Sequence, residues 1–157
     1  TRLVGSEMCI RDSTTRIIIA LIILFLPEDT SIIKLMTTQH YIFLENVRFY
    51  SYHGVAPQET AIGNEFIINL RLKTDFGKAT ETDEVEDTVS YADIYATLKE
   101  EMELPSKLLE HVCGRIVKRL FRDFRKIKEI EIKLAKRNPP MGADIDSAGV
   151  EMHCTRD

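Results

Sequence analysis

The chain has 157 residues, of which 44% are hydrophobic and 29% are charged, a composition typical of one soluble domain. Its net charge is −4 and no basic block occurs, which argues against binding to nucleic acid or to an anionic membrane surface. The three cysteines, Cys9, Cys113 and Cys154, are scattered and lack the spacing of zinc ligands, so we expect no metal site and a reducing, cytoplasmic compartment.

Residues 1–35 differ from the rest of the chain. Their apolar run at 17–26 is too short to cross a bilayer, because a transmembrane helix needs about 20 apolar residues. It has the length of a signal-peptide core, but charged residues and a proline follow it where a small-residue cleavage site would lie. We expect Met36 to be the native start and 1–35 to be a non-native upstream extension, disordered or loosely structured. A signal or anchor segment and a genuine extension are the alternatives.

Two strands are predicted at the start of the domain, which spans 36–157. In residues 41–54, Phe43, Val47 and Phe49 alternate with polar residues, which favours a strand. In residues 64–76 the alternation is strict, which predicts a half-buried strand. Its expected inward residues are Phe66, Ile68, Leu70 and Leu72. The segment 56–64 between the two strands is too long for a tight turn and is expected to be irregular.

Two helices and two further strands follow. Residues 90–103 begin with Ser90 at a plausible N-cap and Asp93 three residues later, a capping-box spacing. Residues 106–124 carry the clearest helical stripe of apolar side chains. Strands are expected at 127–137 and 147–154. The order strand, strand, helix, helix, strand, strand predicts an α+β domain, a four-stranded antiparallel sheet with both helices on one face.

One lysine interrupts a buried strand face. Ile130, Ile132 and Leu134 alternate inward, and the next residue in that phase is Lys136, followed by Pro139 and Pro140. The side chain could simply extend along the strand end to reach water. The functional alternative is a lysine that burial enables to give up its proton near neutral pH.

Four more residues could carry chemistry, and each has a structural interpretation. Glu110, early in the second helix, would complement the helix dipole or accept two parallel N–H bonds from a ligand. Glu59 would be a solvated loop charge or a proton carrier. Tyr91 is in phase with the core face of its helix, so packing is its default role. His53, at a strand end, is expected to be a structural histidine.

Four segments in order resemble the dihydroneopterin aldolase family: "FYSYHGVAPQE", "DTVSYADI", "LLEHV" and "LAKRNPPMGADIDSAGVEM". The resemblance covers 41–153 and implies a lyase of folate biosynthesis. Such an enzyme splits 7,8-dihydroneopterin into 6-hydroxymethyl-7,8-dihydropterin and glycolaldehyde. It needs no cofactor, metal or Schiff base, since the pterin N5=C6 imine serves as the electron sink.

The resemblance also implies roles for single residues. Glu110 should accept bonds from the pterin 2-amino group and N3–H, with backbone contacts from Leu109 and Val89. Lys136 should transfer protons near N5, Tyr91 should shuttle a proton to the intermediate, and Glu59 should relay protons or orient a group.

The implied assembly is the tunnelling fold, in which four subunits close their sheets into a barrel and two rings form a homo-octamer. Active sites then lie between subunits, with Tyr91 from one and Glu59, Glu110 and Lys136 from the other. Two rival functions stay open: epimerisation of dihydroneopterin or its triphosphate at C2′, and pterin binding without catalysis.

Overall fold

The structure, a computed structural model, describes residues 38–156. The expectation for residues 1–35 falls outside this range. Among the described residues, no helix combines the length and the apolar character needed to cross a membrane.

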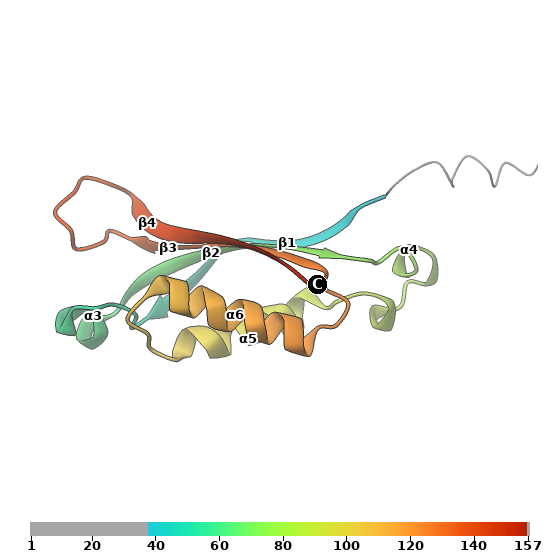
Figure 1. Ribbon diagram of the computed structural model, residues 1–157, viewed down its shortest axis with the longest axis horizontal. Helices are drawn as coiled ribbons and strands as arrows, with labels where there is room; N and C mark the ends of the chain where they lie inside the picture. The colour runs from blue at the N-terminus through green and yellow to red at the C-terminus, as the bar shows by residue number, and fades with distance from the viewer. Residues whose placement is uncertain (1–37, 157) are drawn as a thin grey trace, which may run out of the picture. The chain divides into compact units, whose positions relative to one another are not determined.

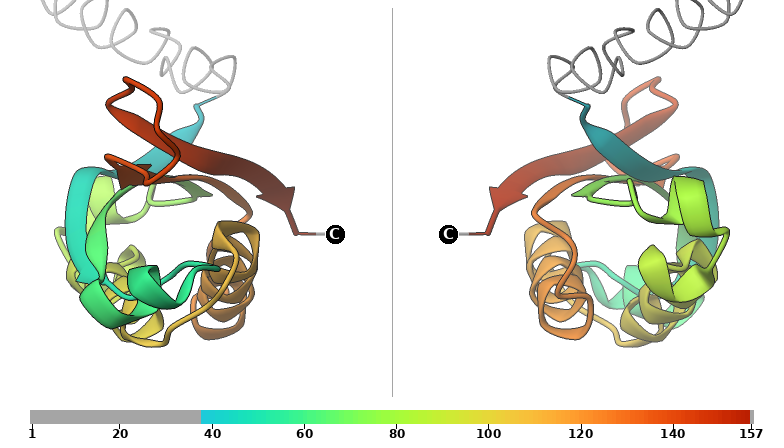
Figure 2. Two further views of the ribbon diagram at one scale, coloured as in Figure 1. Left: turned by 90° about the vertical axis from the view of Figure 1, so that its left-hand side faces the viewer. Right: turned by 90° about the vertical axis from the view of Figure 1, so that its right-hand side faces the viewer.

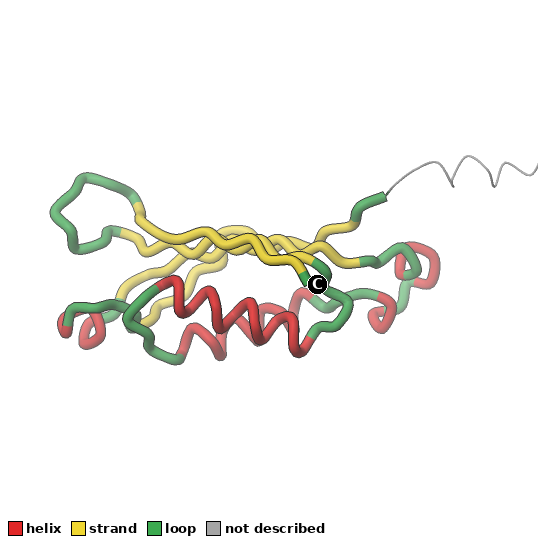
Figure 3. Tube along the Cα trace, viewed as in Figure 1, coloured by secondary structure: helices red, strands yellow, loops and turns green. Residues whose placement is uncertain are grey.

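Four strands form one antiparallel sheet, as predicted. They are β1 (His40–Ser51), β2 (Asn64–Thr74), β3 (Glu129–Arg137) and β4 (Ser147–Thr155), and they lie in the order β1-β2-β3-β4 (Figures 1 and 3). Alternation places the even-numbered residues of β2 and β3 against the core. The strand order makes strands that are consecutive in the chain neighbours in the sheet, and β1 and β4 are the two edges of the sheet within the described chain.

Two antiparallel helices cover one face of this sheet, which confirms the predicted layer arrangement. They are α5 (Tyr91–Glu103) and α6 (Leu109–Asp123), and end-on views show the sheet curving over both (Figure 2). The Ser90 hydroxyl caps α5 by accepting the N–H of Asp93 at 3.3 Å, as the sequence predicted. The hydrophobic core lies between the sheet and these helices. Its side chains with at most 2% exposure include Phe66, Ile68, Leu72, Ile94, Leu98, Val112, Ile116, Leu120, Ile130 and Leu134.

The first strand departs from simple alternation. A β-bulge lies between Leu44 and Val47, and the Asn46 backbone there has φ 54°. The Asn69 side chain accepts the Asn46 N–H at 2.8 Å. The extra residue reverses the phase, so Phe43 is 63% exposed although Val47 packs against the core. Reading Phe43 in one alternating series with Val47 was therefore wrong.

Short helical segments occupy the long connections. The linker expected to be irregular contains α3 (Pro57–Ile62), and the β2–α5 connection contains α4 (Ala79–Thr82) and the 3₁₀ turn η1 (Val85–Asp87). A proline in the first helical position suits α3, because its fixed φ is already helical and its missing N–H is not needed there. In Figure 1, α3 and α4 lie at opposite ends of the domain.

Candidate functional site

Lys136 lies on the helix-facing side of β3, in the direction that the sequence predicted. It is 7% exposed, and Phe66 of β2 is its cross-strand partner. The ammonium nitrogen lies 5.7 Å from the centre of the Phe66 ring. A charge this enclosed requires a partner, since burial of an unpaired ammonium group is costly.

Glu59 supplies that partner. Lys136 Nζ donates to Glu59 Oε1, while Glu59 Oε2 accepts the backbone N–H groups of Val55 at 3.0 Å and Ala56 at 2.9 Å. The bond from Lys136, followed by that from Ala56, holds the pKa of Glu59 below its ordinary value. Glu59 is therefore an ionised, fixed side chain on α3 rather than the solvated loop charge considered above.

A glycine makes this pairing possible. A Cβ atom at Gly54 would lie 2.5 Å from Glu59 Cβ and 2.7 Å from Glu59 Oε2. Any side chain there would push Glu59 away from Lys136. Gly54 was not among the residues predicted to form the site, because only its contact with Glu59 in the folded chain gives it this role.

Glu110 and Leu109 line a hollow that Lys136 also lines. Both belong to the first turn of α6, and Glu110 is exposed. A Cβ at Gly149 would lie 2.2 Å from the Leu134 carbonyl oxygen, so close strand contact requires glycine in this wall. The other residues around this hollow are Lys107, Leu108, Pro139, Ala148 and Val150. Lys136 also lines a second hollow, together with Glu59, Asn64 and Asn138, among others. Lys136 therefore lines one hollow together with Glu110 and another together with Glu59.

Tyr91 and Val89 lie at the opposite end of the helix layer. They line an apolar hollow with Ile42, Phe76 and Val85, and this hollow shares no residue with those around Lys136. The 13 residues of α5 span about 20 Å from Tyr91 to Glu103, the end of α5 from which the chain leads into α6. Tyr91 is 70% exposed, so its default interpretation as a core residue was wrong. One chain does not bring Tyr91 and Val89 to Lys136.

His53 is the buried structural histidine that the sequence favoured. It is 1% exposed, and its Nδ1 accepts the backbone N–H of Ser106 at 3.2 Å. Burial, and after it the nearby charges of Arg115 and Lys136, lowers the pKa of His53 to about 4. The folded protein therefore holds this imidazole neutral.

This neutral imidazole predicts a pH-dependent stability. As pH falls below 6.5, the ordinary pKa of histidine, His53 binds a proton in the unfolded chain. In the folded chain it stays neutral until about pH 4, because its pKa there is about 4. The free energy of unfolding should therefore fall between these limits, by up to about 3 kcal/mol. Urea titrations across this range would measure it. His53→Asn, which cannot titrate, should flatten the slope, and equal slopes in both proteins would contradict the assignment.

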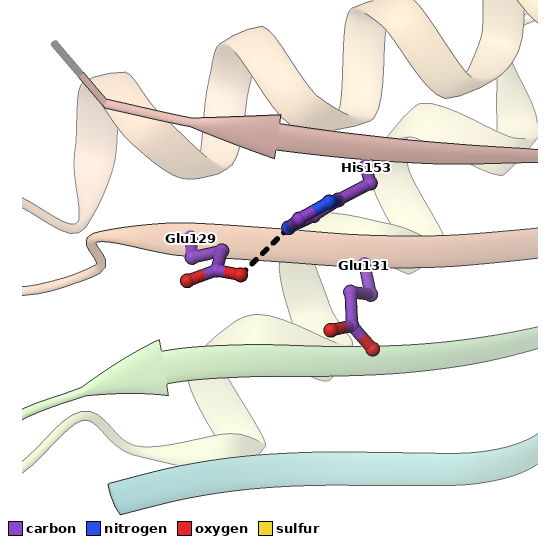
Figure 4. Close-up of side chains that lie close together, drawn as sticks. All are labelled: Glu129, Glu131 and His153. Atoms are coloured by element: carbon purple, nitrogen blue, oxygen red, sulfur yellow. Dashed lines mark hydrogen bonds and ion pairs between the residues drawn. The ribbon is translucent and has the colours of Figure 1, made fainter. Parts of the chain in front are cut away.

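A separate cluster lies on the other face of the sheet. Glu129, Glu131 and His153 place ligand-capable atoms within 4.8 Å of one another, with His153 Nε2 2.7 Å from Glu129 Oε1 (Figure 4). Lys73 lies 3.3 Å from Glu129, and Arg71 lies 3.4 Å from Glu131. These cations already compensate the carboxylates. Strand alternation also puts the cluster on the face away from Lys136.

Two curated relatives share much of this sequence, and a family model covers the same segment. The model described as dihydroneopterin aldolase (FolB) matches residues 42–153. The dihydroneopterin aldolase of Staphylococcus epidermidis is 38% identical over 112 residues, which are 71% of this chain and 93% of the relative. The Bacillus subtilis dihydroneopterin aldolase is 32% identical over 112 residues, with the same two shares.

Solved structures show the same fold. The Escherichia coli dihydroneopterin aldolase in complex with neopterin matches with a TM-score of 0.68 and 27% identity, over 73% of this chain and 98% of that one. A putative dihydroneopterin aldolase from Vibrio cholerae matches with a TM-score of 0.70 and 22% identity, over 76% of this chain and 99% of that one.

Proposed function

Because this chain belongs to the dihydroneopterin aldolase family, we infer that it catalyses the retro-aldol cleavage of 7,8-dihydroneopterin. The products are 6-hydroxymethyl-7,8-dihydropterin and glycolaldehyde, in a step of folate biosynthesis. One observation in the fold carries the proposal for the site. A nearly buried lysine pairs with an ionised, fixed carboxylate and lines a hollow together with an exposed carboxylate at a helix start. This arrangement offers both a proton carrier and an anchor for a ligand with adjacent N–H donors.

The reaction needs an electron sink and proton transfers at the 2′-hydroxyl, at N5 and at C1′. A base removes the proton of the 2′-hydroxyl, the C1′–C2′ bond breaks, its electron pair moves into the N5=C6 imine of the pterin, and N5 takes up a proton. Glycolaldehyde leaves, C1′ of the remaining enol takes up a proton, and N5 gives up its proton as the imine re-forms. We assign the transfers near N5 and the 2′-hydroxyl to Lys136, acting through water, and the proton delivery to the intermediate to Tyr91.

Glu110 is the proposed anchor of the pterin ring. Its exposed carboxylate can accept the 2-amino group and N3–H together, which is the geometry of a bidentate charge-assisted pair. The backbone of Leu109, beside it in α6, and that of Val89 are proposed to contact the ring edge. The neopterin bound by the Escherichia coli relative supports a pterin as the ligand class.

Glu59 is proposed to orient Lys136 rather than to relay protons. Two backbone N–H groups and the lysine already occupy its two oxygens, and these bonds lower its pKa. A carboxylate stabilised in this way is a weak base. Holding Lys136 at one position is the role that its contacts support.

The site is proposed to form between two copies of the chain. The hollow around Tyr91 and Val89 would face the Lys136 side of a neighbour, since one chain separates the two groups. Open strand edges at β1 and β4 could pair between copies and close a tetrameric barrel, and two barrels would form an octamer. The free thiols Cys113 and Cys154 agree with a proposed cytoplasmic location.

Mixing two inactive variants should restore activity. Tyr91→Ala and Lys136→Ala, co-assembled in equal amounts, should regain about one quarter of wild-type sites, because each site draws its two residues independently from neighbouring subunits. Glycolaldehyde release measures the recovery. Lys136→Ala mixed with Glu110→Ala is the matched control. This mixture should regain no activity, since the same subunit contributes both residues to a site. No recovery in the first mixture would contradict a divided site.

Product analysis tests the function itself. Purified full-length protein incubated with 7,8-dihydroneopterin should release glycolaldehyde and 6-hydroxymethyl-7,8-dihydropterin in equal amounts. Formation of the 2′-epimer without glycolaldehyde would indicate an epimerase. Pterin binding without either product would indicate a binding protein.

A further inference from the structure

Two hydrogen bonds tie together the loops that precede α3 and α6. Ser106 N–H donates to His53 Nδ1 at 3.2 Å, and Gly54 N–H donates to the Ser106 carbonyl at 3.0 Å. We call this pair of bonds the 53–106 clamp. The first loop leads to Glu59, and the second leads within four residues to Glu110. The clamp therefore joins the two segments that carry Glu59 and Glu110, both of which line hollows with Lys136.

The clamp stands on the same platform as the lysine. The His53 ring meets the Phe66 ring edge-to-face, with centroids 5.1 Å apart. Phe66 is also the cross-strand partner of Lys136. A single buried aromatic side chain thus supports both the imidazole and the ammonium group.

The tautomer of His53 indicates why a hydrogen-bond acceptor is needed at this position. Because Ser106 N–H donates to Nδ1, the imidazole proton lies on Nε2. That Nε2 is buried and has no hydrogen-bond partner among residues 38–156. An apolar side chain would fill the same space without an unpaired donor, so packing alone does not account for an imidazole here. The cations Arg115 and Lys136 also disfavour a second proton, which would destroy the acceptor.

We propose that His53 is a positioning residue, which acts through the Ser106 backbone to hold the start of α6, and with it Glu110, at a fixed place relative to Lys136 and Glu59. This role rests on the proposed function of the site. Loss of the acceptor frees the segment from Leu104 to Leu108 and moves the pterin anchor, while the Lys136–Glu59 pair remains in place.

Two substitutions separate the acceptor from the bulk of the ring. His53→Leu fills space without an acceptor, whereas the amide oxygen of His53→Asn can occupy the place of Nδ1. His153→Leu, on the opposite sheet face, is the matched control. Each full-length variant is characterised for neopterin affinity, for kcat and KM, for oligomer size, and for hydrogen exchange of peptides covering 104–112.

The clamp predicts a pattern that a general packing role would not produce. In His53→Leu, neopterin affinity falls and KM rises about 10- to 100-fold, while kcat falls less than about fivefold, and exchange at 104–112 accelerates. His53→Asn recovers affinity to within about threefold and restores slow exchange. His153→Leu resembles wild type.

Other outcomes would overturn the proposal. They are unchanged affinity and exchange in His53→Leu, or equal losses in His53→Leu and His53→Asn. Failure of the proposed function is distinguishable, because a wild-type protein that releases no glycolaldehyde would still report the clamp through exchange at 104–112.

Discussion

Lys136→Ala should lower kcat by about 10²- to 10⁴-fold while pterin affinity falls only modestly, since this span is usual for a positioned acid or base. The substitution removes the proposed proton carrier and leaves the Glu110 carboxylate in place. Single-turnover kinetics would measure the loss, with equilibrium neopterin binding alongside. Near-normal turnover would overturn the mechanism proposed above.

Two controls sharpen this expectation. Lys133→Ala, on the same strand but on its exposed face, should retain activity. Lys136→Arg keeps a cation for Glu59 but cannot give up its proton, so it should remain inactive with the ion pair intact. Borohydride reduction in the presence of substrate should leave no covalent adduct on Lys136, because the pterin imine makes a lysine Schiff base unnecessary. A reduced adduct seen by mass spectrometry would contradict this.

Glu110→Gln should weaken binding before it affects chemistry. The amide presents one acceptor and one donor where the pterin offers two donors, so a charge-assisted pair is lost and a donor faces a donor. The expected loss is about 3 kcal/mol, or roughly 100-fold in neopterin affinity. Isothermal titration calorimetry would measure it.

A second helical carboxylate provides the control for Glu110. Glu103→Gln changes an exposed residue at the end of α5 and should bind neopterin as wild type does. Affinity of Glu110→Gln within about twofold of wild type would remove Glu110 from the anchor role.

Local periodicity determined most of the architecture. The order of the strands and long helices, the inward face of β2 and the direction of Lys136 all followed from the repeat of apolar residues. Such repeats can be interpreted from sequence because a side chain's face depends only on its position within its own element. The Ser90 cap could be predicted for the same reason, since its partner is three residues away.

Where the backbone left regular geometry, the sequence pattern misled. The bulge before Val47 needs an extra residue opposite Asn69, and nothing in the alternation of β1 marks it. Likewise, α3 depends on Glu59 bonding the backbone at its own start, in a linker that has no helical period. Both features arise from contacts that local propensity does not encode.

Only the tertiary structure decided where the candidate site residues lie relative to one another within the chain. Glu59 and Lys136 meet across 77 residues because β1, β2 and β3 set the register that brings the α3 loop to the end of β3. Tyr91 and Glu110 begin consecutive helices, yet these helices run antiparallel, so the length of α5 separates them within the chain. Sequence by itself identified the chemical groups. Their distances depend on strand register and helix direction, which are properties of the whole packed domain.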